Sequence, residues 1–395
     1  MAERADFAAE LARRRANAGL SLAALAAKAH AHRGYISNVE HGHRWPSQSV
    51  ALALDAALDA HGALLTAWEI GEAAAVAIPT PDEFDRFERA LAAPRRTDAA
   101  VVEHLARVLA EQRRAEDALG ARSLLPPVLA QLKVIEQLAT DTREPVRREL
   151  LTVGAHYEQF AAWMYQDSMN TAGARRHYDR ATKAAREVDD IDMITSVLSL
   201  KSHLAWSLGD AASAVGLAQA GQRDPRRVSD AVLALVAQQE ARGHALGGDA
   251  AATERALDRS AALTYAAAED PDRAPPWVYF NDPDRLAFQR GVAYVELGRH
   301  ADAVPLLTAA LDRLDGGYDR DRGRYAGMLA FALAGAGDAD GAVAVAKRAA
   351  ELAVETGSAL ATRELRRVRA TLRQQGAEHA VAELAEHLRA LTAGG

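Results

Sequence analysis

The sequence predicts an all-α protein with a small N-terminal domain and a long α-solenoid of helical repeats. Apolar residues recur at the i, i+3, i+4 and i+7 spacing of amphipathic helices from residue 5 to residue 391, and no convincing two-residue alternation indicates a strand. Short turn sequences recur through the second half of the chain, mostly 38 to 50 residues apart. Such a period is typical of stacked helical hairpins.

Composition excludes several classes of protein. The chain has 395 residues, of which 49% are hydrophobic, so it is long enough for more than one folded core. It has no cysteine and therefore no disulfide, thiolate zinc site or cysteine nucleophile. No apolar run approaches the roughly 20 residues that cross a bilayer, and the N-terminus lacks the apolar segment of a secretory signal. We therefore expect a cytoplasmic protein with no membrane partner.

The first seventy residues are expected to form short helices joined by tight turns. The first helix ends at Gly19, Ser21 can cap the second, and the third ends at Gly42. Another helix follows Pro46 and ends at Gly62. Four or five such helices make a compact domain of about sixty residues, near the lower limit for independent folding. We assign residues 1–68 to this domain and call it the head.

Charge distinguishes the head from the rest of the chain. Residues 1–50 carry seven Lys or Arg and four Asp or Glu, a balance of +3, whereas the whole chain has a net charge of −7. The remaining residues therefore carry −10. A basic head on an acidic body favours a nucleic-acid partner.

Two successive helices of the head have helix-turn-helix spacing, with Leu25 and Ala26 on one and Ile36 and Val39 on the next. The segment resembles the DNA-binding head of Xre/Cro-type regulators. The residues that match that pattern are Ser21, Leu25, Ala26, Tyr35, Ile36, Ser37, Glu40, Gly42, Pro46 and Ser47. The segment departs from the pattern at Leu22, where Gln is frequent, and at His30, where the turn usually holds Gly. The second change is tolerated because His adopts positive φ more readily than most residues.

The resemblance implies that the second of these helices enters the major groove of operator DNA. We expect Arg33 to read guanine and Asn38 to read adenine, because their side chains match those base edges. Neighbouring side chains are expected to contact phosphates. The complete predicted DNA-binding set is Ser21, His32, Arg33, Ser37, Asn38, His43 and Arg44. The partner would be double-stranded operator DNA, and the protein would be nucleoid-associated when bound to it.

Four histidines, at positions 30, 32, 41 and 43, have three interpretations. They contact DNA, they form two His-x-His zinc pairs, or they are ordinary surface residues. The two pairs would lie at opposite ends of one helix and lack the carboxylate geometry of an open metal site. We therefore expect neither a metal nor any other cofactor.

Residues 69–120 are predicted to be a helical linker. A capping box at residues 80–83 begins one helix, with Pro at its first helical position. A longer amphipathic helix is expected at about 98–119, and its apolar face either packs against the C-terminal body or forms a dimer contact. That face carries Val101, Leu105, Val108 and Leu109. A homodimer is expected, because one head offers few base-reading side chains and such regulators bind two half-sites.

Residues 121–395 are predicted to form the repeats. The turn sequences lie at 169–170, 209–210, 247–249, 298–299 and 337–338. Small residues follow them at fixed offsets, as tight contacts between helices require. These residues are Ala174, Ala214, Ala303 and Ala342, and seven positions further Ala181, Ala310 and Ala349. This pattern resembles the tetratricopeptide-repeat family, and the whole layout resembles Xre-type regulators with a tetratricopeptide body, frequent in actinobacteria.

In a stack of this kind the first helix of each repeat lines the concave side. Counting back from the turns gives a predicted ligand site. It consists of His156, Gln159, Trp163, Gln166, Ser199, His203, Trp206, Gln238, Arg242, Arg285, Phe288 and Phe331. Aromatic rings with convergent polar groups suit a small molecule or a peptide, although the rings can equally be interhelical core. The proline-rich segment 271–284 either closes over this groove or is only a long connection.

These features favour a one-component transcriptional regulator whose repeat region binds a small-molecule or peptide effector. The alternative is an adaptor whose repeats bind a partner protein and whose head has lost DNA affinity. The sequence has no phosphate-binding loop, dinucleotide fingerprint, metalloprotease motif or nucleophile elbow, so we do not expect an enzyme.

Overall fold

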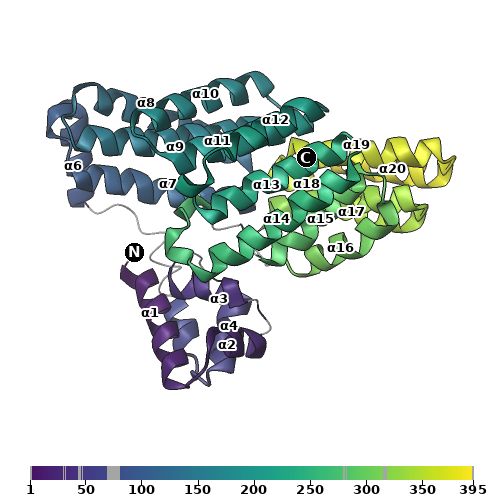
Figure 1. The fold of residues 1–395 in the computed structure, drawn as a ribbon, viewed down its shortest axis with the longest axis horizontal. Helices are drawn as coiled ribbons and strands as arrows, with labels where there is room; N and C mark the ends of the chain where they lie inside the picture. Colours follow the sequence, from purple (N-terminus) through teal and green to yellow (C-terminus); the bar gives the residue numbers. More distant parts are fainter. Residues whose placement is uncertain are drawn as a thin grey trace.

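The structure, a computed structural model, describes residues 2–29, 31, 33–42, 46, 48–68, 81–278, 281, 283–314 and 318–393. Across these residues all regular structure is helical, which confirms the all-α prediction (Figure 1). None of the described helices is long and apolar enough to cross a lipid bilayer.

The head contains α1 (Ala2–Asn17), α2 (Leu22–Lys28), α3 (Arg33–Glu40), α4 (Gln48–Ala57) and a short helix at 63–68. Ser21 caps α2 as expected, because its hydroxyl accepts a hydrogen bond from the backbone N–H of Ala24 at 3.1 Å. The guanidinium of Arg15 donates to both carboxylate oxygens of Glu40, at 2.5 and 2.9 Å, and joins α1 to α3. The apolar core of the head includes Phe7, Leu11, Leu25, Ile36, Leu54 and Leu64.

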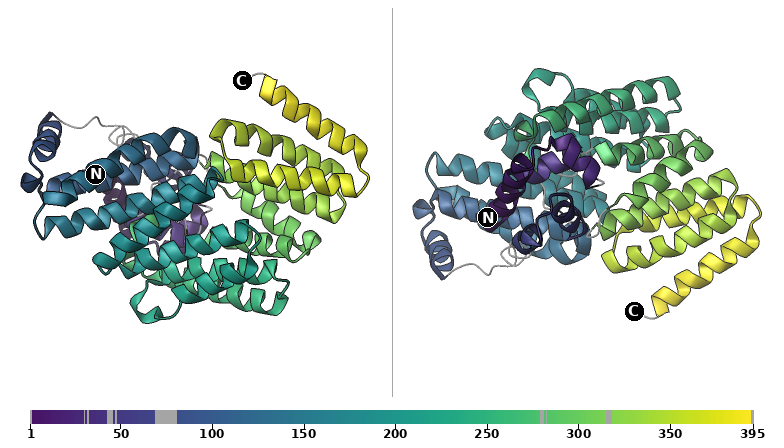
Figure 2. Two further views of the ribbon diagram at one scale, coloured as in Figure 1. Left: turned by 90° about the horizontal axis from the view of Figure 1, so that it is seen from above. Right: turned by 90° about the horizontal axis from the view of Figure 1, so that it is seen from below.

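The body, residues 81–393, continues as a series of antiparallel helices. Its first half consists of α6 (Pro81–Ala92), α7 (Ala99–Leu119), α8 (Ala121–Asp141), α9 (Val146–Asp167), α10 (Thr171–Glu187), α11 (Ile191–Ser207), α12 (Ala211–Gly221) and α13 (Asp230–Leu246). Its second half consists of α14 (Ala250–Glu269), α15 (Leu286–Glu296), α16 (His300–Asp312), α17 (Asp319–Ala336), α18 (Ala339–Thr356), α19 (Ala359–Gln374) and α20 (Glu378–Ala393). Figure 2 shows α6 and α20 at opposite edges of the body.

Consecutive helices of the body pack as hairpins, and each predicted turn lies inside one of them. Gly209 has a φ of +81°, and the carboxylate of Asp210 accepts the backbone N–H of Ser213 at 2.9 Å. A left-handed residue followed by a capping carboxylate ends one helix and starts the next. All seven predicted small residues are buried, with at most 4% exposed. The repeat-like architecture is therefore confirmed, while membership of the tetratricopeptide family stays a prediction.

The structure favours packing over dimer contact for the apolar face of α7. Val101, Leu105 and Leu109 are buried in one cluster with residues of α8 and α9. The hydroxyl of Tyr157 on α9 also donates to the carbonyl of Leu105 at 3.0 Å. The apolar stripe of α7 is thus covered within the chain by α8 and α9, while the domain boundary at residue 120 stays a prediction.

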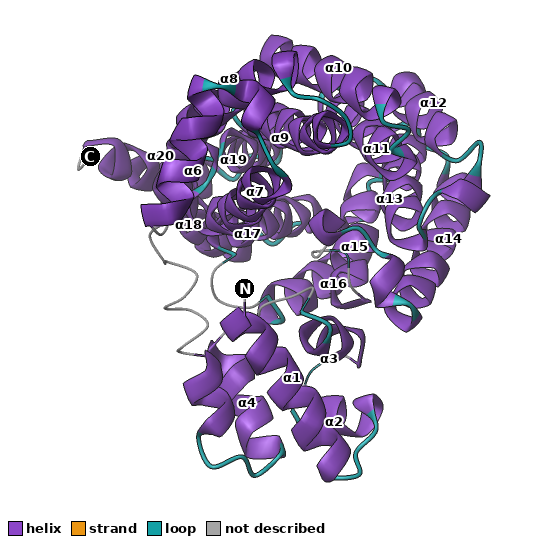
Figure 3. Ribbon diagram, turned by 90° about the vertical axis from the view of Figure 1, so that its left-hand side faces the viewer, coloured by secondary structure: helices purple, strands orange, loops and turns teal. Residues whose placement is uncertain are grey.

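Six inner helices form a closed ring, which the sequence did not predict. Helices α7, α9, α11, α13, α15 and α17 each contact the next, and α17 contacts α7 (Figure 3). The ring is close-packed near Gly120, which has a φ of +73°. A Cβ atom there would lie 2.0 Å from the carbonyl oxygen of Thr356. The packing of the turn between α7 and α8 against the end of α18 therefore requires glycine at this position.

We predict that Gly120→Ala lowers the free energy of unfolding by about 3 kcal/mol or more, because a collision with backbone adds to the cost of positive φ. Gly209→Ala is the matched control, since its φ is +81° and no atom lies within 4 Å of the added Cβ. It should cost only about 1–2 kcal/mol. Urea unfolding of both variants measures the difference, and equal costs would contradict close packing at Gly120.

Candidate functional site

The ring of inner helices surrounds a cavity of about 170 Å³. This space can hold on the order of ten water molecules or a small organic compound. Its walls combine aromatic rings with amide, hydroxyl, guanidinium and carboxylate groups contributed by all six inner helices. An apolar cavity with a few convergent polar groups is the usual form of a ligand site.

Eight of the twelve residues that we assigned to the ligand site line this cavity. They are Gln159, Trp163, Ser199, His203, Gln238, Arg242, Arg285 and Phe288. Counting back from the turns identified these residues because the same position of each hairpin lies on its inner face. Their contact with a ligand stays a prediction.

The other four predicted residues do not line the cavity. Three of them form a layer behind it: the ring of His156 lies 4.3 Å from that of Trp277, the Gln166 amide contacts Nδ1 of His203 at 2.5 Å, and Trp206 is only 4% exposed. Phe331 packs edge-on against a ring of the neighbouring hairpin. Each of the four lies on the inner face of its helix, one or two turns away from a residue that lines the cavity. An adjacent helix covers it there.

Several cavity residues were missed by the sequence analysis. They are Arg113, Glu116 and Asp117 on α7, Trp277 in the proline-rich segment, and Arg320, Asp321, Arg324 and Tyr325 on α17. The dense charges at 112–117 and 319–324, in otherwise alanine-rich helices, are the signal that could have indicated them. Trp277 also favours the interpretation in which segment 271–284 closes over the groove.

Arg320 is the centre of a buried charge cluster between α17 and α7. It is 6% exposed, and its nitrogen atoms lie 3.0 Å from Glu116, 2.9 Å from Asp117 and 3.0 Å from Asp321. Burial alone would lower the pKa of Arg320, but the charges of Asp321, Glu116 and Asp117 raise it well above its ordinary value. Arg320 is therefore permanently charged.

The pKa values of Glu116 and Asp321, both beside Arg320, shift in opposite directions. Burial raises the pKa of Glu116 to about 8, and the charges of Asp117, Asp167 and Asp321 add to this shift. Attraction by Arg320 does not offset burial, because that guanidinium is shared with two other carboxylates. The pKa of Asp321 is instead lowered to about 2, since Arg320 and Arg285 together outweigh its burial. Glu116 is thus mostly protonated at neutral pH.

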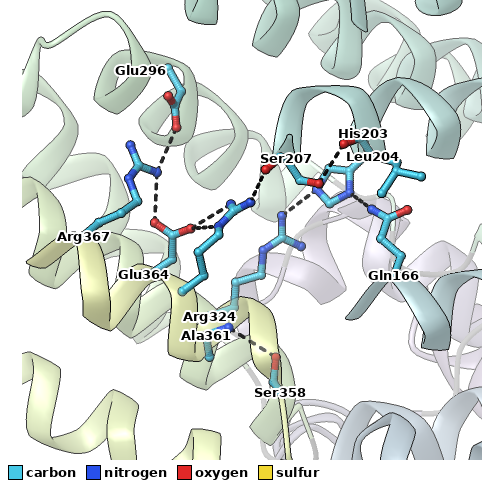
Figure 4. Close-up of polar contacts among 11 residues, drawn as sticks. Gln166, His203, Leu204, Ser207, Glu296, Arg324, Ser358, Ala361, Glu364 and Arg367 are labelled. Atoms are coloured by element: carbon cyan, nitrogen blue, oxygen red, sulfur yellow. Dashed lines mark hydrogen bonds and ion pairs between the residues drawn. The ribbon is translucent and has the colours of Figure 1, made fainter. Parts of the chain in front are cut away.

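A chain of polar contacts joins the inner helices next to the cavity (Figure 4). Nη2 of Arg324 donates to Nε2 of His203 at 2.9 Å. Burial and the charges of Arg324, Arg242 and Arg363 hold the pKa of His203 well below its usual range, so this imidazole is neutral. Arg363 donates to the carbonyl of Ser207 at 2.8 Å and connects α19 to α11.

The predicted DNA-reading residues on α3 face the body. Arg33 forms a two-point ion pair with Glu269 at the end of α14, with Nη2 and Oε2 2.8 Å apart. Asn38 lines a small pocket together with Pro275, Pro276 and Asn281 of the body. In this arrangement neither side chain is directed at DNA. We call this arrangement docked (Figure 1).

The remaining predicted DNA contacts divide into two groups. Ser21 is exposed beside its capped helix, whereas Ser37 is only 4% exposed, so its hydroxyl is not presented to a phosphate here. His32, His43 and Arg44 lie outside the described residues. Where side chains are described, no group of three or more His, Cys, Asp or Glu is arranged to hold a metal ion.

Residues 6–68 match the sequence profile of a helix-turn-helix domain. The match covers most of the described head and suggests DNA binding. Helix-turn-helix domains of this kind typically carry no enzymatic activity. A search for relatives among curated proteins gave no match.

We predict that the stability of the protein falls as the pH rises from 7 to 8.5. Folding raises the pKa of Glu116 from an ordinary 4.5 to about 8, so the folded state retains a proton that is lost as the pH passes through that value. Urea midpoints at the two pH values measure the slope. Glu116→Gln should remove most of this dependence of stability on pH, because the amide is neutral at both pH values. Glu355→Gln, at an exposed position, is the control and should leave the dependence unchanged. An unchanged slope in Glu116→Gln would show that Glu116 is ionised in the folded protein.

Proposed function

We propose that this chain is a one-component transcriptional regulator whose head binds operator DNA and whose body binds an effector in the ring cavity. The helix-turn-helix match, the basic head and the mixed apolar and polar lining of the cavity support this function. The observation that carries it is a physical link between the cavity and the DNA-reading helix. An adaptor without DNA binding has no need of such a link.

The link consists of the described residues Pro276, Trp277 and Asn281. Trp277 contributes to the cavity wall, while the adjacent Pro276 lines the pocket that contains Asn38 of α3. Gln238, which also lines the cavity, donates to the side-chain oxygen of Asn281 in that same pocket at 3.0 Å. A ligand that contacts Trp277 or Gln238 is therefore one residue or one hydrogen bond away from the pocket that contains Asn38 of α3.

The docked arrangement and DNA reading exclude each other. Reading guanine requires the guanidinium of Arg33, which Glu269 occupies in the docked arrangement. Asn38 must likewise face a base rather than the body. An effector that binds the docked and released arrangements with different affinity therefore changes DNA occupancy.

Two heads are expected to act together. A single α3 offers too few base-reading side chains for useful specificity, so a C2 dimer on half-sites about one helical turn apart is the expected complex. The apolar face of α7 is buried within the chain and does not supply that dimer contact.

We predict that Arg33→Ala and Asn38→Ala each weaken binding to the specific site by about 1–3 kcal/mol, with little effect on nonspecific DNA. Fluorescence anisotropy with an operator selected from random duplexes measures both. Wild-type affinity and footprints in both variants would show that α3 does not read the bases.

A second prediction concerns the docked arrangement. Glu269→Arg should raise operator affinity about fivefold, because it removes an exposed ion pair and brings a like charge to Arg33. Glu355→Arg adds the same charge on α18, at an exposed position remote in the sequence, and controls for the general attraction of DNA to positive charge. Equal affinities of the two variants would contradict inhibition by docking.

A further inference from the structure

The cavity contains more positive than negative charge. Five arginines line it against three acids. One of those acids, Glu116, is mostly protonated at neutral pH, because burial raises its pKa to about 8. Asp117 and Asp321 lie against Arg320, and Asp321 also pairs with Arg285 at 2.8 Å. These carboxylates are therefore already engaged with other arginines.

Arg242 is a buried cation with neutral partners. It is 3% exposed, and it donates to the side-chain oxygens of Gln289 at 2.5 Å and Gln239 at 3.3 Å. Among the described residues, its Nε atom has no hydrogen-bond partner and no carboxylate forms an ion pair with it. Burial and the charge of Arg324 lower its pKa to about 9, so it is still charged at neutral pH. A buried charge without a counter-charge is costly.

Arg324 has the same character. Its Nη2 atom donates to the neutral imidazole of His203 at 2.9 Å, and it forms no ion pair with any carboxylate in the described part of the chain. Both guanidinium groups border a cavity that also presents the rings of Trp163, Trp277 and Phe288. Two incompletely balanced cations beside an apolar wall are expected where a ligand supplies the missing charge.

We infer that the cavity binds a small organic acid. Its carboxylate or phosphate group contacts Arg242 and Arg324, because the guanidinium fork matches the geometry of both oxyanions. Its apolar part packs on the aromatic rings. This inference deepens the proposed function by giving the chemical class of the effector, and it is tested without DNA.

The first test compares organic acids with their neutral amides on the purified full-length chain. The panel includes naphthalene-1-acetate with naphthalene-1-acetamide and benzoate with benzamide, and it is measured by thermal unfolding and titration calorimetry. We expect at least one acid to bind saturably and raise Tm, with its amide about tenfold weaker or more. The inference is overturned if no acid in the panel binds better than its amide.

The second test separates ligand binding from a structural role. Arg242→Met and Arg324→Gln should each weaken binding of that acid about tenfold or more, while the ligand-free Tm stays unchanged or rises. Arg367→Gln is the control, because Arg367 pairs with Glu296 at 3.1 Å and Glu364 at 3.0 Å. It should lower Tm and leave acid binding intact.

The opposite pattern would overturn the inference: loss of stability in Arg242→Met and Arg324→Gln with acid binding retained. That result would not contradict the operator-binding predictions for Arg33→Ala and Asn38→Ala. A regulator with an uncharged effector fails these two tests yet still passes those on α3, so the two proposals fail separately.

Discussion

The contact of Arg320 with the acids of α7 closes the body into a ring. A solenoid of helical hairpins normally leaves its concave side open. Here one buried guanidinium on α17 lies within 3.0 Å of three acidic side chains, two of them on α7. Any other register would leave these charges buried without partners, at a cost of several kcal/mol. The groove becomes a cavity because of this cluster, which also places Arg324 beside His203.

The same geometry gives the cavity a route to the head. Trp277 lines the cavity, while Pro276 and Val278 on either side of it line the pocket that contains Asn38 of α3. The ion pair between Arg33 of the head and Glu269 of the body is exposed to solvent, with side chains 45% and 60% exposed. Exposed pairs contribute little to stability. Docking is therefore weak enough for DNA or an effector to reverse it.

Local signals explain what the sequence predicted well. Helix periodicity, the glycine turns and the capping Asp residues act over a few neighbours, so the hairpins and their inner faces were predictable, including Trp163 and Arg242. Ring closure was not predictable, because Arg320 and Asp117 are 203 residues apart and no periodic pattern relates them. The contact of Arg33 with Glu269, 236 residues away, could not be predicted from the sequence for the same reason. The missed cavity side chains of α17 depend on the contact of Arg320 with α7, and Trp277 lies in an irregular segment between helices.

The distance between the head and the body reports directly whether DNA binding releases the docked arrangement. The chain has no native cysteine, so spin labels can be attached at Leu52→Cys on α4 and Ala262→Cys on α14, both exposed. Pulsed electron–electron double resonance then gives the distribution of distances between the labels. We expect one narrow distribution in the free protein and a shift to longer distances with saturating operator duplex. The same distribution with and without bound DNA would contradict this expectation.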